Sequence, residues 1–375
     1  MSEKYDRGDA GAFHGGSAVG EGGRATGGQL DAGDVENPVR VGLNGFGRIG
    51  RSVFRALLAD ERVALVGLND VMDGDDVEYL ARYDTVMGRL GSVAFTADGD
   101  GAGRLRVGDS SVPVYSRRDP AGLPWDALDV DVALECTGVL RTRADAAAHL
   151  DGGADTVLVS APPKGEEPVK QLVYGVNHGE YDGEDVVSSA SCTTNSVTPV
   201  AKVLDERFGV EHGTLTTVHA YTGSQNLIDG PRAKRRRGRA AAENVVPTST
   251  GAAEAATEIL PGLEGKLDGT AMRVPVPNGS ITEVVASLAD DPGAAEVNDA
   301  FRDAADGGPL AGVLGYTDDE IVSADVVGLP FSSTVDLRST NVVGDGGLYK
   351  VRTWYDNEFG FANRMLDVAY YVENY

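Results

Sequence analysis

Cysteine is scarce in this chain, and long apolar segments are missing from it. Two of its 375 residues are cysteine, Cys136 and Cys192, which is too few for a disulfide-stabilised secreted scaffold or for a zinc site built mainly from thiolates. No run of about 18 uninterrupted apolar residues is present, which excludes a membrane-spanning helix. The first residues lack the basic-then-apolar order of a secretory signal. We therefore expect a cytoplasmic protein without a metal centre or a membrane partner.

Cations are also few, and lysine is the rarer of them. The chain has 33 Lys and Arg residues against 58 Asp and Glu, a net charge of −25, and only seven of the cations are lysine. At about 1 M salt the Debye length is roughly 3 Å, so the self-repulsion of such an acidic surface is screened. We interpret the charge as an adaptation to a salty cytoplasm, with an ordinary acidic cytosolic protein as the alternative. Nucleic-acid binding by the chain as a whole is disfavoured, because it depends on clustered cations.

Three regions differ in composition and pattern. Residues 1–37 contain ten glycines and few large apolar side chains, which predicts a disordered tail. Residues 38–189 alternate short apolar strands with helical patterns, as is typical of a Rossmann-type, doubly wound parallel α/β sheet. Residues 190–357 carry longer strands that alternate Thr and Ser with Val and Leu, which predicts a second, α+β domain on a mostly antiparallel sheet. The segment 358–375 predicts an amphipathic helix whose apolar face consists of Phe361, Met365, Val368 and Val372.

A glycine-rich turn follows the first predicted strand. The sequence there reads V-G-L-N-G-F-G-R-I-G, with a G-x-G-x-x-G pattern at Gly45, Gly47 and Gly50. The next strand leads to Asp70, at the spacing expected for a carboxylate that binds an adenosine ribose. The glycines let a pyrophosphate approach the N-terminus of the following helix. Asp70 would repel a 2′-phosphate, so we expect NAD as the cofactor in preference to NADP. A plain strand-to-helix turn is the alternative.

The motif S-C-T-T-N contains the candidate nucleophile, Cys192. Its hydroxyl and amide neighbours suit a helix N-terminus, where the dipole and free amides would stabilise a thiolate. His219 ends a predicted strand and is the expected imidazole partner, which would hold the thiolate as an ion pair and move protons. The alternatives are a small buried hydrophobic residue for the cysteine and a satisfied core histidine for His219. Cys136 lies in an apolar run and fits an inert structural role.

A basic run, R-A-K-R-R-R-G-R at residues 232–239, stands out in so acidic a chain. It contains no aromatic residue for base stacking, so a local anion site is favoured over nucleic-acid binding. Thr248–Ala253 and Met272–Pro275 would contribute to that site. They carry hydroxyls, a glycine amide and Arg273, which are groups that bind phosphate oxygens.

Taken together, these motifs resemble the phosphorylating glyceraldehyde-3-phosphate dehydrogenase family of the bacterial and eukaryotic type. The resemblance extends over residues 38–375. It depends on N-G-F-G-R-I-G-R, L-N-D, A-S-C-T-T-N, H-A-Y-T, T-G-A-A, M-R-V-P-x-P-N and W-Y-D-N-E-F-G, which occur in the family's order. It implies NAD-dependent oxidative phosphorylation of glyceraldehyde 3-phosphate to 1,3-bisphosphoglycerate through a cysteine thiohemiacetal and thioester. It also implies a homotetramer, and a C-terminal helix that packs on the cofactor domain.

The resemblance further implies roles for individual residues. Cys192 is then the nucleophile, His219 its acid/base partner, and Asn357 the residue that orients the nicotinamide carboxamide. The cofactor's phosphate turn and ribose are bound by Gly45, Gly47, Arg48, Ile49, Gly50 and Asp70. The substrate's own phosphate is bound by Thr222, Arg237 and Arg273, and the attacking inorganic phosphate by Ser191, Thr193, Thr250 and Gly251.

Three features depart from the common family pattern. Phe361 stands where a tyrosine is usual, Gly230 stands where NAD-preferring members often have a larger apolar residue, and the tail of 37 residues has no counterpart. In addition, the loop G-S-Q-N-L-I-D-G-P-R-A-K-R-R-R is an unusual version of the one that lines neighbouring cofactor sites in the family's tetramer. The nearest enzymatic alternative is a dehydrogenase of erythrose 4-phosphate, which shares these motifs. Aspartate-semialdehyde dehydrogenase shares the chemistry but lacks W-Y-D-N-E and H-A-Y-T. An anion- or nucleic-acid-binding protein that uses residues 232–239 is an alternative of another class. A non-catalytic Rossmann domain would leave the Cys–His–Arg set unexplained.

Overall fold

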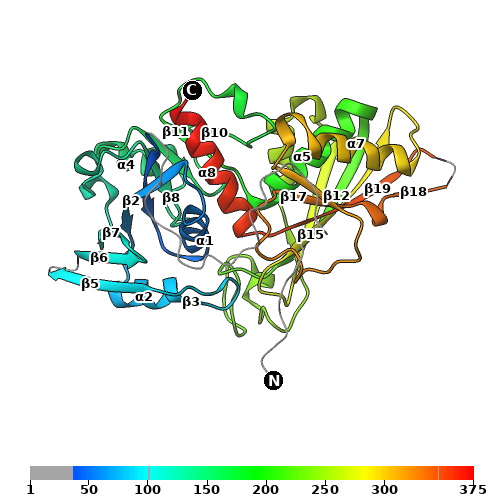
Figure 1. Cartoon of the computed structure of the whole chain (residues 1–375). Helices are drawn as coiled ribbons and strands as arrows, with labels where there is room; N and C mark the ends of the chain where they lie inside the picture. Colours follow the sequence, from blue (N-terminus) through cyan, green and yellow to red (C-terminus); the bar gives the residue numbers. More distant parts are fainter. Residues whose placement is uncertain (1–36, 100–101, 345) are drawn as a thin grey trace. The chain divides into compact units, whose positions relative to one another are not determined.

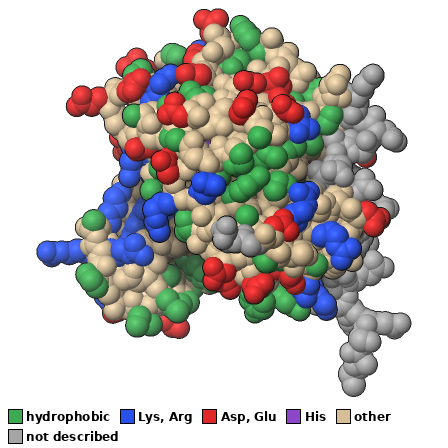
Figure 2. Space-filling view, turned by 90° about the vertical axis from the view of Figure 1, so that its left-hand side faces the viewer, with side chains coloured by type: hydrophobic (Ala, Val, Ile, Leu, Met, Phe, Trp, Pro, Cys, Tyr) green, Lys and Arg blue, Asp and Glu red, His purple; other side chains and the backbone are tan. Residues whose placement is uncertain are grey.

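The computed structural model describes residues 37–99, 102–344 and 346–375, so the predicted tail, apart from its last residue, lies outside the described residues. The described chain forms two units (Figure 1). Residues 37–191 and Ala362–Tyr375 make the N-terminal unit, and Cys192–Phe361 makes the C-terminal unit. In the described ranges, no helix combines the length and the apolarity needed to cross a membrane. Figure 2 shows Asp and Glu side chains at many places on the face that it presents.

The N-terminal unit is built on a nine-stranded sheet with the order β10-β11-β9-β8-β1-β2-β7-β6-β5. Every pair from β10 to β7 is parallel, and only β7-β6 and β6-β5 are antiparallel. The predicted Rossmann-type parallel sheet is confirmed. Its strands are β1 (Val39–Asn44), β2 (Val63–Asn69), β5 (Val93–Gly99), β6 (Ala102–Val107), β7 (Ser110–Tyr115), β8 (Val132–Glu135), β9 (Thr156–Val159), β10 (Lys170–Gln171) and β11 (Val186–Ser188).

Helices connect the strands and cover the sheet. The helix α1 (Arg48–Leu57) connects β1 to β2, and the longest helix of the unit is α8 (Phe359–Glu373). The predicted apolar face of α8 is buried, and Asp367 on α8 pairs with Arg62 of this unit at 2.7 Å. The C-terminal helix therefore packs on the N-terminal unit. The remaining elements of the unit are α2 (Gly74–Arg82), α3 (Arg143–Ala146), α4 (Ala148–Asp151) and the small pair β3 (Tyr83–Asp84) and β4 (Gly88–Arg89).

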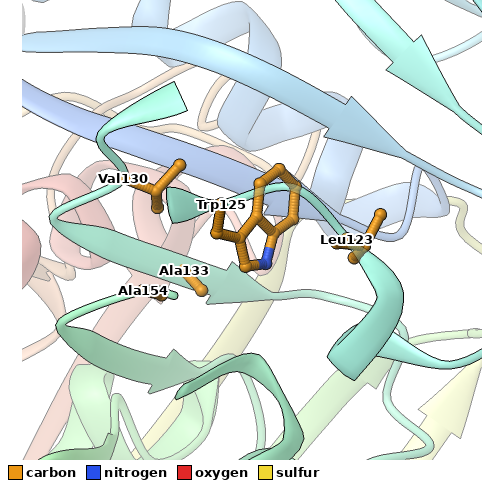
Figure 3. Packing of buried hydrophobic residues seen from close by; sticks show 5 residues of the cluster. All are labelled: Leu123, Trp125, Val130, Ala133 and Ala154. Atoms are coloured by element: carbon orange, nitrogen blue, oxygen red, sulfur yellow. The ribbon is translucent and has the colours of Figure 1, made fainter. Parts of the chain in front are cut away.

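Trp125 fills the space beside two glycines of the central strands (Figure 3). Its side chain is fully buried. A Cβ atom at Gly42 on β1 would lie 3.1 Å from the indole ring, and one at Gly67 on β2 would lie 2.8 Å from it. Glycine at both positions therefore makes room for the large ring, which buries a large apolar area in the core. The ring belongs to a cluster with Leu123, Val130, Ala133 and Ala154.

The C-terminal unit is built on an eight-stranded sheet with the order β13-β14-β12-β15-β19-β17-β16, and β18 pairs with β19. The pairs β12-β14 and β16-β17 are parallel and the others are antiparallel, which confirms the predicted mostly antiparallel sheet. Its strands are β12 (Val210–Ala220), β13 (Val246–Ser249), β14 (Leu267–Val274), β15 (Ser280–Leu288), β16 (Leu314–Thr317), β17 (Ser333–Asp336), β18 (Asn341–Val342) and β19 (Tyr349–Tyr355).

Three helices complete this unit. The helices α5 (Cys192–Phe208) and α7 (Ala294–Asp306) lie on one face of the sheet (Figure 1), and α6 (Ala252–Ile259) follows β13. The helix α5 begins at Cys192 and continues through Pro199 to Phe208, so the proline does not set its start. The candidate nucleophile is therefore presented at the first residue of a long helix.

Candidate active site

The glycine-rich turn lies between β1 and α1. Gly45 has a φ of 97°, and a Cβ there would lie 2.6 Å from Thr137 N. A Cβ at Gly50 would overlap with Gly45 O, whereas one at Gly47 would meet open space. Gly47 is the N-cap of α1, which has no capping side chain and no acidic residue in its first turn. An uncapped helix N-terminus beside open space fits the pyrophosphate of a dinucleotide.

Asp70 follows β2 and faces the same turn. Its Oδ2 accepts a hydrogen bond from Phe46 N at 2.6 Å, and its Oδ1 accepts one from Met72 N at 3.0 Å. These bonds hold the carboxylate beside the glycine-rich turn. Each oxygen can accept a further hydrogen bond, because a carboxylate oxygen has two lone pairs. The geometry therefore fits a nucleotide with a free ribose hydroxyl.

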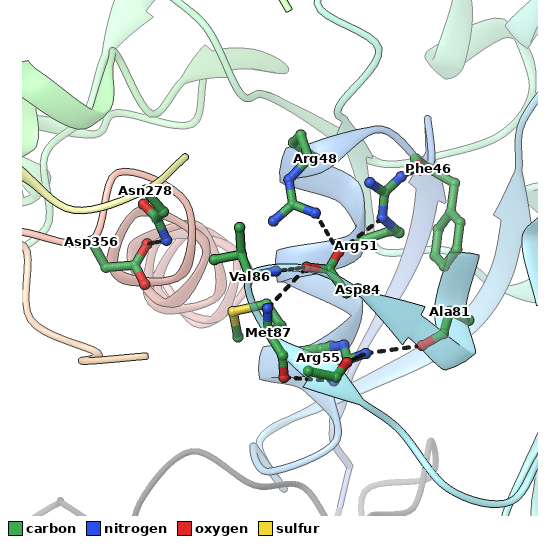
Figure 4. A network of polar contacts seen from close by, with 11 residues as sticks. Phe46, Arg48, Arg51, Arg55, Ala81, Asp84, Val86, Met87, Asn278 and Asp356 are labelled. Atoms are coloured by element: carbon green, nitrogen blue, oxygen red, sulfur yellow. Dashed lines mark hydrogen bonds and ion pairs between the residues drawn. The ribbon is translucent and has the colours of Figure 1, made fainter. Parts of the chain in front are cut away.

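Arg48 and Arg51, in the first turn of α1, pair with the buried carboxylate of Asp84 (Figure 4). Burial acts to raise the pKa of Asp84, but hydrogen bonds from Met87 N and Arg48 outweigh it and lower the pKa to about 2. Asp84 is therefore an anion across the neutral pH range, and it anchors Arg48 at the start of the helix. Ile49, predicted together with Arg48, lies in the same turn and is partly exposed.

A buried polar chain links the carboxyl ends of three neighbouring strands, and the sequence analysis missed it. Asn44 on β1 donates to Glu135 Oε2 on β8 at 2.6 Å, and Asn69 on β2 donates to Asn44 Oδ1 at 2.7 Å. Glu135 Oε1 accepts from Thr137 N at 2.8 Å, and Glu135 Oε2 lies 3.2 Å from Nε2 of the buried His149. Dinucleotides bind at the carboxyl ends of such strands. In the sequence, this polar chain could have been predicted from the polar residues Asn44, Asn69 and Glu135, each of which ends an apolar strand.

Cys192 is the first residue of α5, and its Sγ lies 3.5 Å from His219 Nε2. Two residues earlier, Ala190 has a φ of 58°, a left-handed conformation that residues other than glycine seldom adopt. Ser188 Oγ accepts a hydrogen bond from Ala190 N at 3.0 Å and supports this turn. The strained turn leads from β11 through Ser191 into the helix. By contrast Cys136 is buried, and burial raises the pKa of its thiol, which fits the predicted inert role.

Strand pairing brings Arg273 to His219. The strands β12 and β14 are parallel and place these two residues directly opposite each other. Arg273 Nη1 lies 2.7 Å from His219 Nδ1 and donates to Ala220 O at 2.9 Å. His219 Nδ1 also lies 2.7 Å from Ala220 O. Nδ1 can accept from Arg273 or donate to Ala220 O, but it cannot do both in one tautomer. In the tautomer that donates to Ala220 O, Nε2 presents a lone pair to the Cys192 thiol, as a general base requires.

The charge state of this pair differs from the sequence-based expectation. Burial raises the pKa of the Cys192 thiol and outweighs Arg273 and the hydrogen bonds at Thr193, which lower it. Burial, followed by the positive charge of Arg273, lowers the pKa of His219 to about 3. Both shifts favour a neutral thiol beside a neutral imidazole. Burial therefore acts against the expected thiolate–imidazolium ion pair, because it removes both groups from water and disfavours the charged form of each.

Tyr355 also belongs to this site, although the sequence analysis did not single it out. Its hydroxyl lies 3.1 Å from Thr193 Oγ1, and its ring meets the His219 ring edge-on with centroids 6.0 Å apart. Burial and the neighbouring Cys192 raise the pKa of Tyr355, so the phenol is neutral. It fixes the Thr193 hydroxyl next to the nucleophile. Its place in the motif W-Y-D-N-E was the only signal in the sequence.

Thr222 and Arg237 lie in the same unit as Arg273, near the end of β12. Thr222 Oγ1 is 2.8 Å from Ser224 Oγ, and Arg237 Nη1 donates to Ser224 Oγ at 3.4 Å. Burial lowers the pKa of Arg273, and the positive charge of Arg237 contributes to the same shift. The two guanidinium groups are therefore near enough to repel each other, and a shared anion would relieve that repulsion.

The basic run lines a cavity at the edge of the sheet. Lys234 Nζ donates to Ser249 Oγ at 2.8 Å, and Arg237 Nε donates to Thr248 Oγ1 at 3.0 Å. The cavity has a volume of about 330 Å³, and its described lining contains no aromatic residue and no carboxylate. Such a lining suits a phosphate-like anion and lacks the stacking surfaces used for nucleic-acid bases. The lining consists of Lys234, Arg235, Arg236, Arg237, Pro247, Thr248, Ser249 and Thr270.

Thr250 and Gly251 follow β13, and the Thr250 side chain bonds to the backbone two residues further along the chain. Thr250 Oγ1 accepts a hydrogen bond from Ala252 N at 3.1 Å, and Gly251 is the N-cap of α6. The structure therefore places them at a helix N-terminus, where an anion could bind. It shows no direct contact between these two residues and Cys192 in the part of the chain that it describes.

Asn357 lies just beyond β19 and is buried. Its Oδ1 accepts a hydrogen bond from Ser280 Oγ at 2.8 Å. The preceding residue, Asp356, accepts hydrogen bonds from Asn278 Nδ2, Gly328 N and Phe359 N, each within 2.8 Å. The backbone around Asn357 is therefore firmly held, and its side-chain amide is oriented by Ser280.

Comparisons with known proteins agree with this geometry. The model of the family described as glyceraldehyde 3-phosphate dehydrogenase, NAD binding domain, matches residues 39–143, and that of the C-terminal domain matches residues 191–357. A glyceraldehyde-3-phosphate dehydrogenase of Haloarcula vallismortis is 65% identical over 338 residues, which cover 90% of this chain and 99% of the relative. Those of Streptomyces coelicolor and Bacillus subtilis are 49% and 48% identical, and cover 90% and 89% of this chain and 99% and 98% of the relatives.

These relatives bear the name of one activity, which disfavours erythrose 4-phosphate as the substrate. NAD is the cofactor that the matching family model names, and the open glycine turn with its anchored carboxylate fits that dinucleotide. Since two family models and these relatives span nearly all of the described chain, and its cysteine and histidine meet at 3.5 Å, the chain belongs to the glyceraldehyde-3-phosphate dehydrogenase family.

Proposed function

We propose that Cys192 and His219 carry out the oxidative phosphorylation of glyceraldehyde 3-phosphate in this chain. The observation that supports this most directly is the 3.5 Å approach of Cys192 Sγ to His219 Nε2 at the start of a helix. An imidazole nitrogen at this distance can take the thiol proton as the sulfur attacks. A neutral pair is suited to this step, because the proton is transferred only when the aldehyde is present.

The thiol attacks the aldehyde carbon, and its proton passes through His219 Nε2 to the carbonyl oxygen, which gives a thiohemiacetal on Cys192. His219 then removes the hydroxyl proton of the thiohemiacetal. NAD supplies the hydride acceptor when it is bound. The product of this step is a thioester on Cys192, which inorganic phosphate cleaves to an acyl phosphate while the sulfur regains its proton. Burial, and after it the positive charge of Arg273, lowers the pKa of His219, so both favour a neutral imidazole before the substrate arrives.

The phosphate groups are assigned to cationic and hydroxyl groups of the same site. Thr222, Arg237 and Arg273 would hold the substrate's own phosphate, since two guanidinium groups near each other favour a dianion. The attacking phosphate would bind among hydroxyls and a helix N-terminus. Asn357 would orient the nicotinamide carboxamide, and Gly45, Gly47, Arg48, Ile49, Gly50 and Asp70 would hold the rest of the cofactor. The residues proposed to bind the attacking phosphate are Ser191, Thr193, Thr250 and Gly251.

The nucleophile is tested by replacing it with serine. In Cys192→Ser we expect no measurable NADH formation from glyceraldehyde 3-phosphate, with unchanged NAD affinity and melting temperature. Cys136→Ser is the matched control, and it should retain turnover because that thiol is buried in the other unit. Dehydrogenase activity in Cys192→Ser would disprove the assignment.

We also propose that the chain works as a homotetramer in a salt-rich cytoplasm. Among the described residues of the C-terminal unit, four large apolar side chains are exposed by at least 60%, and exposed apolar surface is typical of a face that another chain covers. They are Leu227, Ile228, Val245 and Val322. The net charge of −25 and the Haloarcula relative support the salt-rich setting. Light scattering in molar KCl should give four times the chain mass of 39.1 kDa. A monomer mass would contradict the proposal.

A further inference from the structure

Ser280 is a buried hydroxyl that connects two parts of the proposed active site. It is the first residue of β15 and is 1% exposed. In the sheet, β15 lies between β12, which carries His219, and β19, which leads to Asn357. Ser280 Oγ accepts a hydrogen bond from Ala220 N at 3.1 Å and donates one to Asn357 Oδ1 at 2.8 Å. One hydroxyl therefore joins the end of the His219 strand to the Asn357 side chain.

This arrangement determines which end of the Asn357 amide is available to a ligand. A serine hydroxyl has one proton. Ser280 Oγ accepts from Ala220 N through one lone pair and donates its proton to Asn357 Oδ1. The oxygen end of the amide is thus turned toward β15, and the NH2 end remains as the donor for a ligand. Asp356 accepts hydrogen bonds from Asn278 Nδ2 (Figure 4) and from Gly328 N, which hold the segment next to Asn357. The direction of the Asn357 amide is therefore the part that Ser280 sets.

We infer that Ser280 is a positioning residue for cofactor recognition, and that through it Asn357 presents its NH2 group to the carbonyl oxygen of the nicotinamide carboxamide. Without the Ser280 hydroxyl, the amide of Asn357 could rotate and offer its oxygen, which cannot donate to a carbonyl. The same change would release the Ala220 amide next to His219. The inference depends on the cofactor role of Asn357 proposed above.

The test compares two ligands that differ in the nicotinamide group. Calorimetry measures the dissociation constants of NAD and of ADP-ribose, which lacks the nicotinamide ring. In Ser280→Ala we expect the NAD constant to rise about three- to tenfold, the loss of one oriented hydrogen bond, with the ADP-ribose constant unchanged. The 3-acetylpyridine analogue of NAD keeps the carbonyl oxygen and lacks the amide N–H groups. It should be weakened to the same extent as NAD.

Ser333→Ala is the matched control. Ser333 is a fully buried serine of the same sheet that bonds to Thr353 on a neighbouring strand. It should leave the ratio of the two dissociation constants as in the unmodified chain.

Two outcomes separate this inference from the proposal that it depends on. If Asn357→Ala lowers NAD affinity relative to ADP-ribose and Ser280→Ala does not, the role of Ser280 is overturned and the role of Asn357 stands. If Asn357→Ala leaves the ratio unchanged, the cofactor role of Asn357 fails, and the inference fails with it. Equal weakening of both ligands in Ser280→Ala would mark a loss of fold and would also overturn the inference.

Discussion

Lowering the pH from 7 to 5 should destabilise this protein, and His219 should make an identifiable contribution to that loss. The side chain is 4% exposed, and burial and the charge of Arg273 lower its pKa from 6.5 to about 3. In the unfolded chain the ring binds a proton below pH 6.5, whereas in the folded protein it stays neutral. The contribution of His219 to stability is therefore complete above pH 6.5 and is lost progressively as the pH falls toward 3.

The magnitude follows from the two pKa values. Each pH unit between them costs about 1.4 kcal/mol, because the unfolded state gains a proton that the folded state does not. Between pH 7 and pH 5 the unfolded ring becomes almost fully protonated and the folded ring remains neutral. The free energy of unfolding should therefore fall by about 2 kcal/mol from His219 alone.

The assay is urea-induced unfolding at pH 7 and pH 5, at one protein concentration and one KCl concentration. His219→Gln replaces the ring with a polar side chain that does not titrate, so the unmodified protein should lose about 2 kcal/mol more than this variant between the two pH values. The control is His212→Gln, which removes an exposed histidine of the same strand and should behave as the unmodified protein. NMR of 13C-labelled histidine should show the His219 ring neutral at pH 5. Equal losses in the unmodified protein and His219→Gln, or a ring that titrates near 6.5, would refute the reasoning.

Three further predictions concern the cofactor turn and the surface. Gly47→Ala should weaken NAD binding without changing the melting temperature, because its Cβ would enter open space beside the turn. Gly50→Ala should lower the melting temperature, because its Cβ would overlap with Gly45 O. Equal melting temperatures for the two variants would contradict this. Asp70→Gly should raise NADP use relative to NAD by about fivefold or more, the effect of removing roughly 1 kcal/mol of like-charge repulsion, and an unchanged ratio of kcat/KM would refute the ribose role. Turnover should persist or rise between 0.1 and 1 M KCl, because the Debye length shortens from about 10 Å to about 3 Å and the acidic surface is screened. A loss of turnover would contradict the interpretation of the acidity as an adaptation to salt.

Local patterns predicted the elements well. The strand, glycine turn and helix around Gly45 could be predicted because each depends on a few neighbouring residues. The same holds for the helix that begins at Cys192, since hydroxyl neighbours and apolar spacing act within one or two turns. The charge state of Cys192 and His219 could not be predicted from the sequence, because it depends on how much protein surrounds both groups, and a helix terminus is only one contribution to that balance.

Contacts between segments that are far apart in the chain could not be predicted from the spacing of residues along the sequence. Arg273 reaches His219 because β12 and β14 pair in one register, and a shift by one residue would turn the side chain to the other face. Ser280 reaches both Ala220 and Asn357 because β15 lies between two particular strands. No local pattern distinguishes such a serine from any other polar residue at a strand end.

The sequence by itself determined the fold class and the family, and it predicted the cysteine and histidine that the structure brings within 3.5 Å of each other. These depend on motifs in which each residue type is needed for its own chemistry, a thiol at Cys192 and an imidazole at His219. Only the tertiary structure decided that burial disfavours charge on this pair, that Arg273 lies against the imidazole, and that Ser280 donates a hydrogen bond to Asn357. The physical reason is that proton affinity and amide direction are set by burial and by partners from other strands. Both exist only once the sheet has formed.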